Sequence, residues 1–167
     1  MKKLLLSAVA ISILSGGLAH AAEGIKKDIT IVATINDAIF VSKPDGSTWY
    51  DKEELFAKDY TQSKFASKDL PVRVFTTNPD FTLSLTQPLT ITRNDGAQLN
   101  NVEVVFAGQV VTEGALTDIK QTTTSTGGYD NTYTLKINAE APTNVVAGST
   151  TNGQYQGDLV LLFEPKP

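Results

Sequence analysis

The strongest constraint on the fold is a series of short alternating segments that begins after residue 70. Apolar and polar residues alternate in residues 72–76, 81–86 and 133–139, and the apolar segment of residues 102–106 is a further expected strand. An alternation with a period of two places successive side chains on opposite faces of a strand, so that one face can be buried. Turn signals such as Asn-Asp-Gly at residues 94–96 separate the segments. Short strands divided by turns predict an all-β antiparallel sandwich, and we find no amphipathic helix of normal length.

Several shorter segments extend this pattern. Further strands are expected at residues 38–41, 89–92, 109–111 and 155–164. The last of these, Y-Q-G-D-L-V-L-L-F-E, is apolar on both faces over part of its length and closes the chain.

Two segments do not predict strands. Residues 49–68 are mixed in charge and their aromatic residues are irregularly spaced, so we expect irregular structure there. Residues 121–131 are rich in Thr, Ser and Gly and predict an exposed loop. The Pro-Asp-Gly of residues 44–46 predicts a turn, because Pro presets φ and Gly tolerates a positive φ.

The first residues have the features of a secretory signal peptide. Lys2 and Lys3 are followed by an apolar run over residues 4–14 and by the small-x-small sequence Ala19-His20-Ala21. The apolar run is shorter than the roughly 20 residues that span a bilayer, which favours a cleaved signal over an anchor. We expect residues 1–21 to be removed, and the mature chain to be exported without membrane insertion.

Composition excludes several classes of function. The net charge is −4, and there is no basic run in the mature chain, which argues against nucleic acid and anionic membranes as partners. There is no Cys, and the only His is His20, within the signal peptide. Ser-His-Asp and Cys-His catalysis and the usual zinc and copper sites are therefore excluded. We expect no enzyme activity, no cofactor and no metal.

Residues 27–35, K-D-I-T-I-V-A-T-I, alternate near the start of the mature chain and predict a long strand. One face of it is apolar and carries Ile29, Ile31, Ala33 and Ile35. The other face carries Asp28, Thr30, Val32 and Thr34. Alternation alone leaves open whether this strand completes the sandwich of its own chain or joins the sheet of another molecule.

The C-terminal end of the sequence bears on which sheet residues 27–35 join. Only Pro165-Lys166-Pro167 follow the last expected strand, whereas a seven-strand immunoglobulin-like sandwich would place one more strand there. A final strand without a neighbour exposes an edge that invites pairing with another chain. Strand addition from residues 27–35 of a neighbouring molecule would fill the vacancy, and head-to-tail addition that does not close generates a filament.

Several sequence blocks resemble those of the major subunits of colonisation-factor fimbriae, the alpha-clade pilins of the alternative chaperone–usher pathway. The blocks are K-K-D-I-T-I-V-A-T-I at 26–35, V-F-T-T-N at 74–78, F-A-G-Q-V-V-T at 106–112, T-L-K-I-N-A-E-A-P at 134–142 and G-Q-Y-Q-G-D-L-V-L-L-F at 153–163. The sequence departs from the family pattern at Asn36-Asp37, where Asp-Pro is usual, and in its charged C-terminal tail.

The resemblance implies an incomplete immunoglobulin-like sandwich that is completed by donor-strand exchange. Residues 22–36 would be the donor extension and residues 37–167 the pilin domain. The partners would be identical subunits in a head-to-tail fibre, a periplasmic chaperone, an outer-membrane usher and a tip adhesin. The subunit would cross the periplasm to a fimbria at the cell surface and support adhesion to host surfaces.

The resemblance also implies the interface residues. The donor residues would be Ile29, Ile31, Ala33 and Ile35. The edge of the acceptor groove would carry Tyr155, Leu159, Leu161 and Phe163.

Two other classes of function are weighed against this one. A monomeric secreted sugar- or surface-binding β-sandwich would need an exposed aromatic platform, for which Trp49 is the only Trp. An exported hydrolase could use an acidic pair such as Glu53 with Glu54, or Asp118 with Glu140, but the absence of His and Cys disfavours it.

Overall fold

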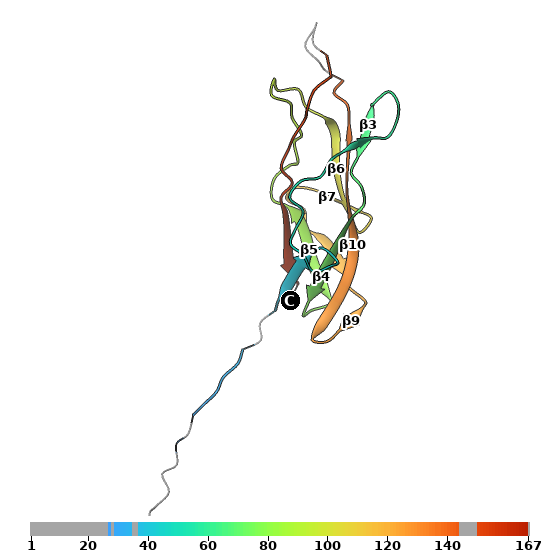
Figure 1. Cartoon of the computed structure of the whole chain (residues 1–167). Coiled ribbons are helices and arrows are strands. Elements are labelled where there is room, and N and C mark those ends of the chain that lie inside the picture. Colours follow the sequence, from blue (N-terminus) through green and yellow to red (C-terminus); the bar gives the residue numbers. More distant parts are fainter. Residues whose placement is uncertain (1–26, 28, 35–36, 144–149, 167) are drawn as a thin grey trace, which may run out of the picture. The chain divides into compact units, whose positions relative to one another are not determined.

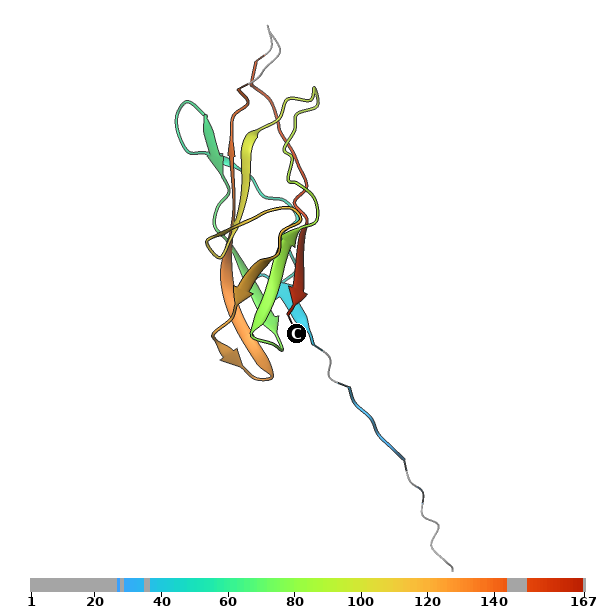
Figure 2. The same ribbon diagram turned by 180° about the vertical axis from the view of Figure 1, so that it is seen from behind.

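The structure is a computed structural model that describes residues 27, 29–34, 37–143 and 150–166. The chain divides into two compact units, Met1–Thr34 and Ile35–Pro167. Within the second unit the described residues form strands, turns and irregular segments, with no helix (Figures 1 and 2). The all-β prediction is therefore confirmed.

The strands are short except for β10, and they lie in two sheets. Their bounds are β1 (Ile39–Ser42), β2 (Phe56–Ala57), β3 (Lys64–Ala66), β4 (Leu70–Thr76), β5 (Asp80–Leu85), β6 (Asn100–Phe106), β7 (Gln109–Val111), β8 (Thr117–Lys120), β9 (Thr124–Ser125), β10 (Gly128–Glu140) and β11 (Leu161–Pro165).

The larger sheet is built around β10. Its order is β1-β4-β10-β3-β2, and β6 and β9 also pair with β10, while β7 pairs with β6. The smaller sheet has the order β11-β5-β8, so β11 and β8 are its two edges. All these strand pairs are antiparallel.

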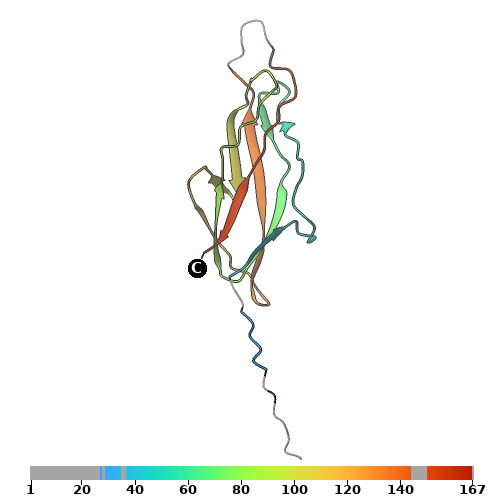
Figure 3. The same cartoon turned by 90° about the vertical axis from the view of Figure 1, so that its left-hand side faces the viewer.

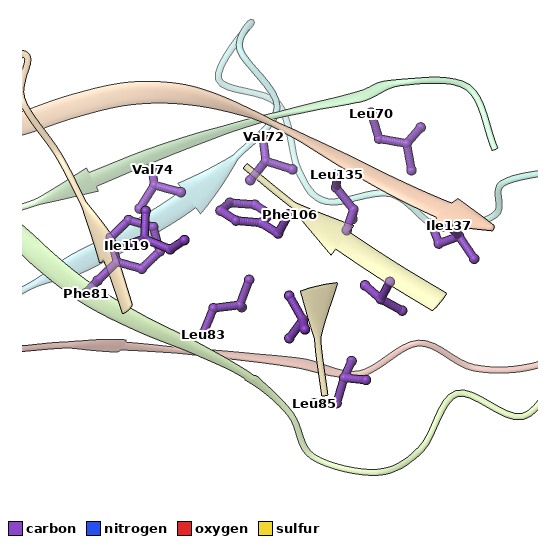
Figure 4. Close-up of a cluster of buried hydrophobic side chains, with 12 residues drawn as sticks. Leu70, Val72, Val74, Phe81, Leu83, Leu85, Phe106, Ile119, Leu135 and Ile137 are labelled. Carbon is purple, nitrogen blue, oxygen red and sulfur yellow. The ribbon is translucent and has the colours of Figure 1, made fainter. Parts of the chain in front are cut away.

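The hydrophobic core lies between the inward faces of the two sheets, as Figure 4 shows. Val72 and Leu135 from the larger sheet and Phe81 and Leu83 from the smaller one are almost completely buried. These are the apolar positions of the alternating segments, so burial of one face accounts for the alternation. Phe106 of β6 lies in the same cluster and contacts Phe81 edge-on, with ring centroids 6.4 Å apart.

The loop predicted at residues 121–131 is wrong from residue 124 onward, where β9 and the start of β10 form a hairpin. Gly127 takes a φ of 82° in the turn between the two strands. A Cβ on Gly128 would lie 2.1 Å from the carbonyl oxygen of Thr76, so only glycine fits there. Backbone pairing and this close approach form the hairpin, and neither requires the apolar alternation on which the prediction relied.

Two other segments differ from the strand predictions. β8 was not predicted, because T-D-I-K contains a single apolar residue. The segment of residues 89–92 forms no strand, and only Thr92 makes isolated bridges, to Gln98 and Gln156. The region of residues 49–68 is irregular as expected, apart from β2 and β3.

The last strand is shorter than predicted. β11 begins at Leu161, and the preceding residues follow the sandwich through separate contacts. These include the bridge between Gln156 and Thr92 and a hydrogen bond from the Thr86 N–H to the Val160 carbonyl, 3.2 Å long.

The N-terminal unit, taken by itself, has no paired strand among Lys27 and residues 29–34. Ile31 and Val32 expose 89% and 80% of their surface. The predicted donor residue Ile35, like Asp28, lies outside the described residues.

Candidate strand-acceptor site

β11 is an edge strand that pairs only with β5 among the described strands. The Thr86 N–H donates to the Val160 carbonyl, and the Lys166 N–H donates to the Asp80 carbonyl at 3.0 Å. In an antiparallel pair the hydrogen-bonded positions alternate, so Leu162 and Glu164 also direct their peptide groups toward β5. The peptide groups of the intervening residues, Leu161 and Phe163, therefore point to the opposite edge.

Pro165 fits this geometry. It occupies a position whose nitrogen faces away from β5, opposite Phe81 in the register. A proline at such a position removes no hydrogen bond from the pair, which explains how it is tolerated at the end of the strand.

The side chains along this edge divide between two faces. Leu159, Leu161 and Phe163 are half-buried and pack against the core cluster. Val160 and Leu162 lie on the outer face, and each exposes 42% of its surface. The structure thus brings together three of the four predicted acceptor residues and shows that their side chains face the core. The sequence alone does not show this, because the segment is apolar on both faces.

Phe163 joins the edge strand to the aromatic centre of the core. Its ring centroid lies 5.7 Å from Phe106, 6.2 Å from Phe81 and 6.0 Å from Trp49. The Phe106 and Trp49 contacts are edge-on, a favourable arrangement for aromatic pairs. Trp49 is partly buried against this cluster and is not an exposed platform.

A second segment near this edge also lacks strand partners. Residues 48–55 belong to no strand, and no backbone–backbone hydrogen bond involves them in the part of the chain that the structure describes. Trp49, Tyr50 and Leu55 nevertheless pack against the core. The Tyr50 hydroxyl donates to the Pro71 carbonyl at 2.9 Å, which anchors the segment to β4. Figure 3 looks onto this side, with β11 in red and the segment in teal.

Tyr155, the fourth predicted acceptor residue, has different surroundings. Its hydroxyl donates to the Thr151 carbonyl at 2.8 Å, and the guanidinium of Arg93 lies 5.6 Å from its ring centroid. It is half-buried and is not one of the side chains packed on the core cluster.

The comparisons with known proteins agree with this architecture. Residues 25–164 match the family of CS1 type fimbrial major subunits. The chain belongs to this family. The resemblance to colonisation-factor fimbrial major subunits is thereby confirmed, and the subunit is a structural component of a surface fimbria rather than an enzyme.

One solved structure shows the fold of the subunit. The CooA pilin subunit from enterotoxigenic Escherichia coli superposes with a TM-score of 0.62, at 22% sequence identity. The match covers 77% of this chain and 90% of that one. No curated protein sequence matches the subunit. Its described residues contain no helix of the length and apolarity needed to cross a membrane.

The two members of one alternative acidic pair, Asp118 and Glu140, each have a separate structural partner. Asp118 forms an ion pair with Lys166 at 3.1 Å, and Glu140 accepts a hydrogen bond from Asn101 at 2.6 Å. The described residues hold no group of three or more potential metal ligands. Two open hollows of about 440 and 410 Å³ lie beside β6, and neither is lined by residues of β11.

Arg93 holds the segment that leads to the last strand. Its guanidinium donates to both carboxylate oxygens of Asp95, at 2.8 and 2.6 Å, and to the Thr150 carbonyl at 2.8 Å. The hydrogen bonds from Arg93 lower the pKa of Asp95 to about 2. A carboxyl whose pKa is depressed on folding stabilises the fold above its unfolded pKa, and that contribution is lost as the pH falls toward 2.

The glycines of the G-Q-Y-Q-G block in the subunit are explained by close contacts on this segment. A Cβ at Gly153, whose φ is 145°, would lie 2.6 Å from the Cδ atom of Arg93. A Cβ at Gly157 would lie 2.2 Å from the carbonyl oxygen of Thr90. Glycine is therefore required at these two positions because the segment packs closely against residues 90–93.

Gly157→Ala should therefore destabilise the subunit by roughly 2–3 kcal/mol, because backbone must move to admit the methyl group. Gly114→Ala is the matched control, since a Cβ there meets nothing within 4 Å and only its φ of 68° is unfavourable. We expect the control to cost about 1 kcal/mol. Urea unfolding of the two variants measures the difference, and equal losses would contradict the steric explanation.

Proposed function

We propose that the subunit polymerises by strand donation. Residues 29–35 of one subunit insert beside β11 of the next, between that edge and the segment of residues 48–55. One observation carries the proposal. The peptide groups of Leu161 and Phe163 point to the free edge of β11, away from β5, while the side chains of the same two residues face the core and are only half-buried.

The donor segment has the complementary properties. Ile29 and Ile31 are almost fully exposed in the free chain, and burial of each would contribute roughly 1.5–3 kcal/mol. Each new ladder hydrogen bond would add about 0.5–1.5 kcal/mol. These gains are opposed by the entropy of ordering the segment, about 1–2 kcal/mol per residue, so the apolar contacts decide the outcome.

Because donor and acceptor are different surfaces, the contact is heterologous, and repetition without closure gives a fibre. A subunit with an open edge also needs protection before assembly. A periplasmic chaperone that lends a temporary strand, an outer-membrane usher and a tip adhesin fit these needs. The fibre would display its subunits at the cell surface and support adhesion to host surfaces.

Gel electrophoresis of the mature protein tests the proposal. We expect a ladder of multimers in SDS without boiling that collapses to monomer on boiling. Deletion of residues 22–36 should abolish the ladder. A monomeric mature protein whose own residues 29–35 are protected from hydrogen exchange would contradict strand donation.

The sugar-binding alternative lacks a supporting observation. Trp49, the platform it requires, packs edge-on against Tyr50 and Phe163, with centroid distances of 5.7 and 6.0 Å.

A further inference from the structure

We propose that the donor strand runs antiparallel to β11 with Val32 directly opposite Leu162, and that the contact of these side chains on the outer face sets the register. This inference rests on the proposed function and specifies the arrangement of its strands. It starts from two features that strand insertion alone does not explain. Val32 is the only apolar residue on the outward face of the donor. Leu162 is an exposed apolar residue on the outer face of the acceptor strand.

The backbone of β11 favours such a contact at Leu162. The peptide groups of Leu162 point to β5, so on the opposite edge it is a non-hydrogen-bonded position. At such positions of an antiparallel pair the Cα atoms approach to about 4.5 Å and the side chains are closest. Leu162 is therefore well placed to contact an outward side chain of an added strand.

The surroundings of Leu162 extend the contact. Val160 lies on the same face two residues before Leu162. Val32 would thus join Leu162 and Val160, two neighbouring exposed apolar side chains of the outer face.

The proposed register also aligns the inward residues. With Val32 opposite Leu162, Ile31 falls opposite Phe163 and Ala33 opposite Leu161. These are hydrogen-bonded positions of the free edge, whose N–H and C=O groups point toward the donor.

Polar residues agree with this register as well. Thr30 falls opposite Glu164, and Asp28, by its position in the sequence, falls opposite Lys166. Opposite charges directly across a strand pair are favourable, whereas like charges are destabilising.

The neighbouring registers are worse. A shift that places Val32 opposite Val160 sets Asp28 against Glu164. The opposite shift sets Val32 against Glu164. A parallel strand with Val32 opposite Leu162 sets Asp28 against Asp158.

Engineered cysteine pairs test the register, because the chain contains no Cys. The variant Thr30→Cys with Glu164→Cys places two thiols at a non-hydrogen-bonded pair, within the roughly 4.4–6.8 Å Cα separation of a disulfide. On oxidation of the full mature chain we expect a multimer ladder that survives boiling in SDS and disappears on reduction.

Two matched pairs report two of the alternative arrangements. Thr30→Cys with Leu162→Cys would cross-link in the shifted antiparallel register, and Thr30→Cys with Val160→Cys in the parallel one. We expect the Glu164 pair to cross-link at least tenfold more than either. Preferential cross-linking of another pair would overturn the register and leave strand donation intact.

A non-covalent ladder without a disulfide in any pair would also overturn the register. If the mature protein forms neither a non-covalent ladder nor a cross-link, strand donation itself fails, and the register with it.

Discussion

Phe106→Ala is expected to lower the free energy of unfolding by about 3–5 kcal/mol, the usual cost of truncating a buried phenylalanine. Phe106 is 0% exposed and lies at the centre of the aromatic cluster. Its ring centroid is 5.3 Å from Tyr133, 6.4 Å from Phe81 and 5.7 Å from Phe163. The substitution leaves a cavity that joins both sheets, so the effect should reach β11 as well as β6.

Phe40→Ala is the matched control, because Phe40 exposes 66% of its surface on an edge strand. We expect it to cost less than about 1 kcal/mol. Urea unfolding can be followed by the fluorescence of Trp49, the only Trp, whose surroundings include Phe163. Similar losses for the two variants would show that Phe106 is not central to the core.

The sequence predicts those strands whose apolar residues alternate because one face is buried. β4, β6 and β10 are of this kind. In β5 the polar face is buried as well, at Thr82 and Ser84, but its apolar residues also alternate. The inward residues of these four strands form the core. β8 and β9 depend instead on backbone pairing with neighbours distant in sequence or across a glycine turn. Such pairing leaves little trace in hydrophobic periodicity, so these strands could not be predicted from it.

The candidate site was predictable to a similar degree. Leu161 and Phe163 of β11, and Leu159 just before it, pack against the core, and all three belong to the apolar segment that the sequence places at the end of the chain. Their direction was not predictable, because Val160 and Leu162 are equally apolar, and only the register with β5 separates the faces. Tyr155 shares their spacing but packs beside Arg93.

The part played by residues 48–55 was not predictable either. The contribution that we propose for them consists of partly buried side chains, those of Trp49, Tyr50 and Leu55, on a backbone without strand partners. The hydrophobic periodicity of the sequence indicates neither the partial burial of these side chains nor the missing strand partners of their backbone.

Ile31→Asp should abolish the ladder of multimers on the unboiled gel. Insertion beside β11 would bury an unpaired carboxylate against Phe163 and its neighbours, at a cost of about 3–5 kcal/mol or more. The stability of the free subunit should not change, because Ile31 exposes 89% of its surface there. A loss of assembly with an unchanged urea midpoint would locate the effect in the donor and not in the fold.

Thr34→Asp provides the comparison within the same segment. In the proposed arrangement Thr34 lies on the outward face of the donor, where a carboxylate stays in water, so this variant should retain the ladder. The two variants carry the same new charge and differ in the face that bears it. Equal assembly of both, or equal loss in both, would mean that the alternation of residues 29–35 does not decide which side chains enter the neighbouring subunit.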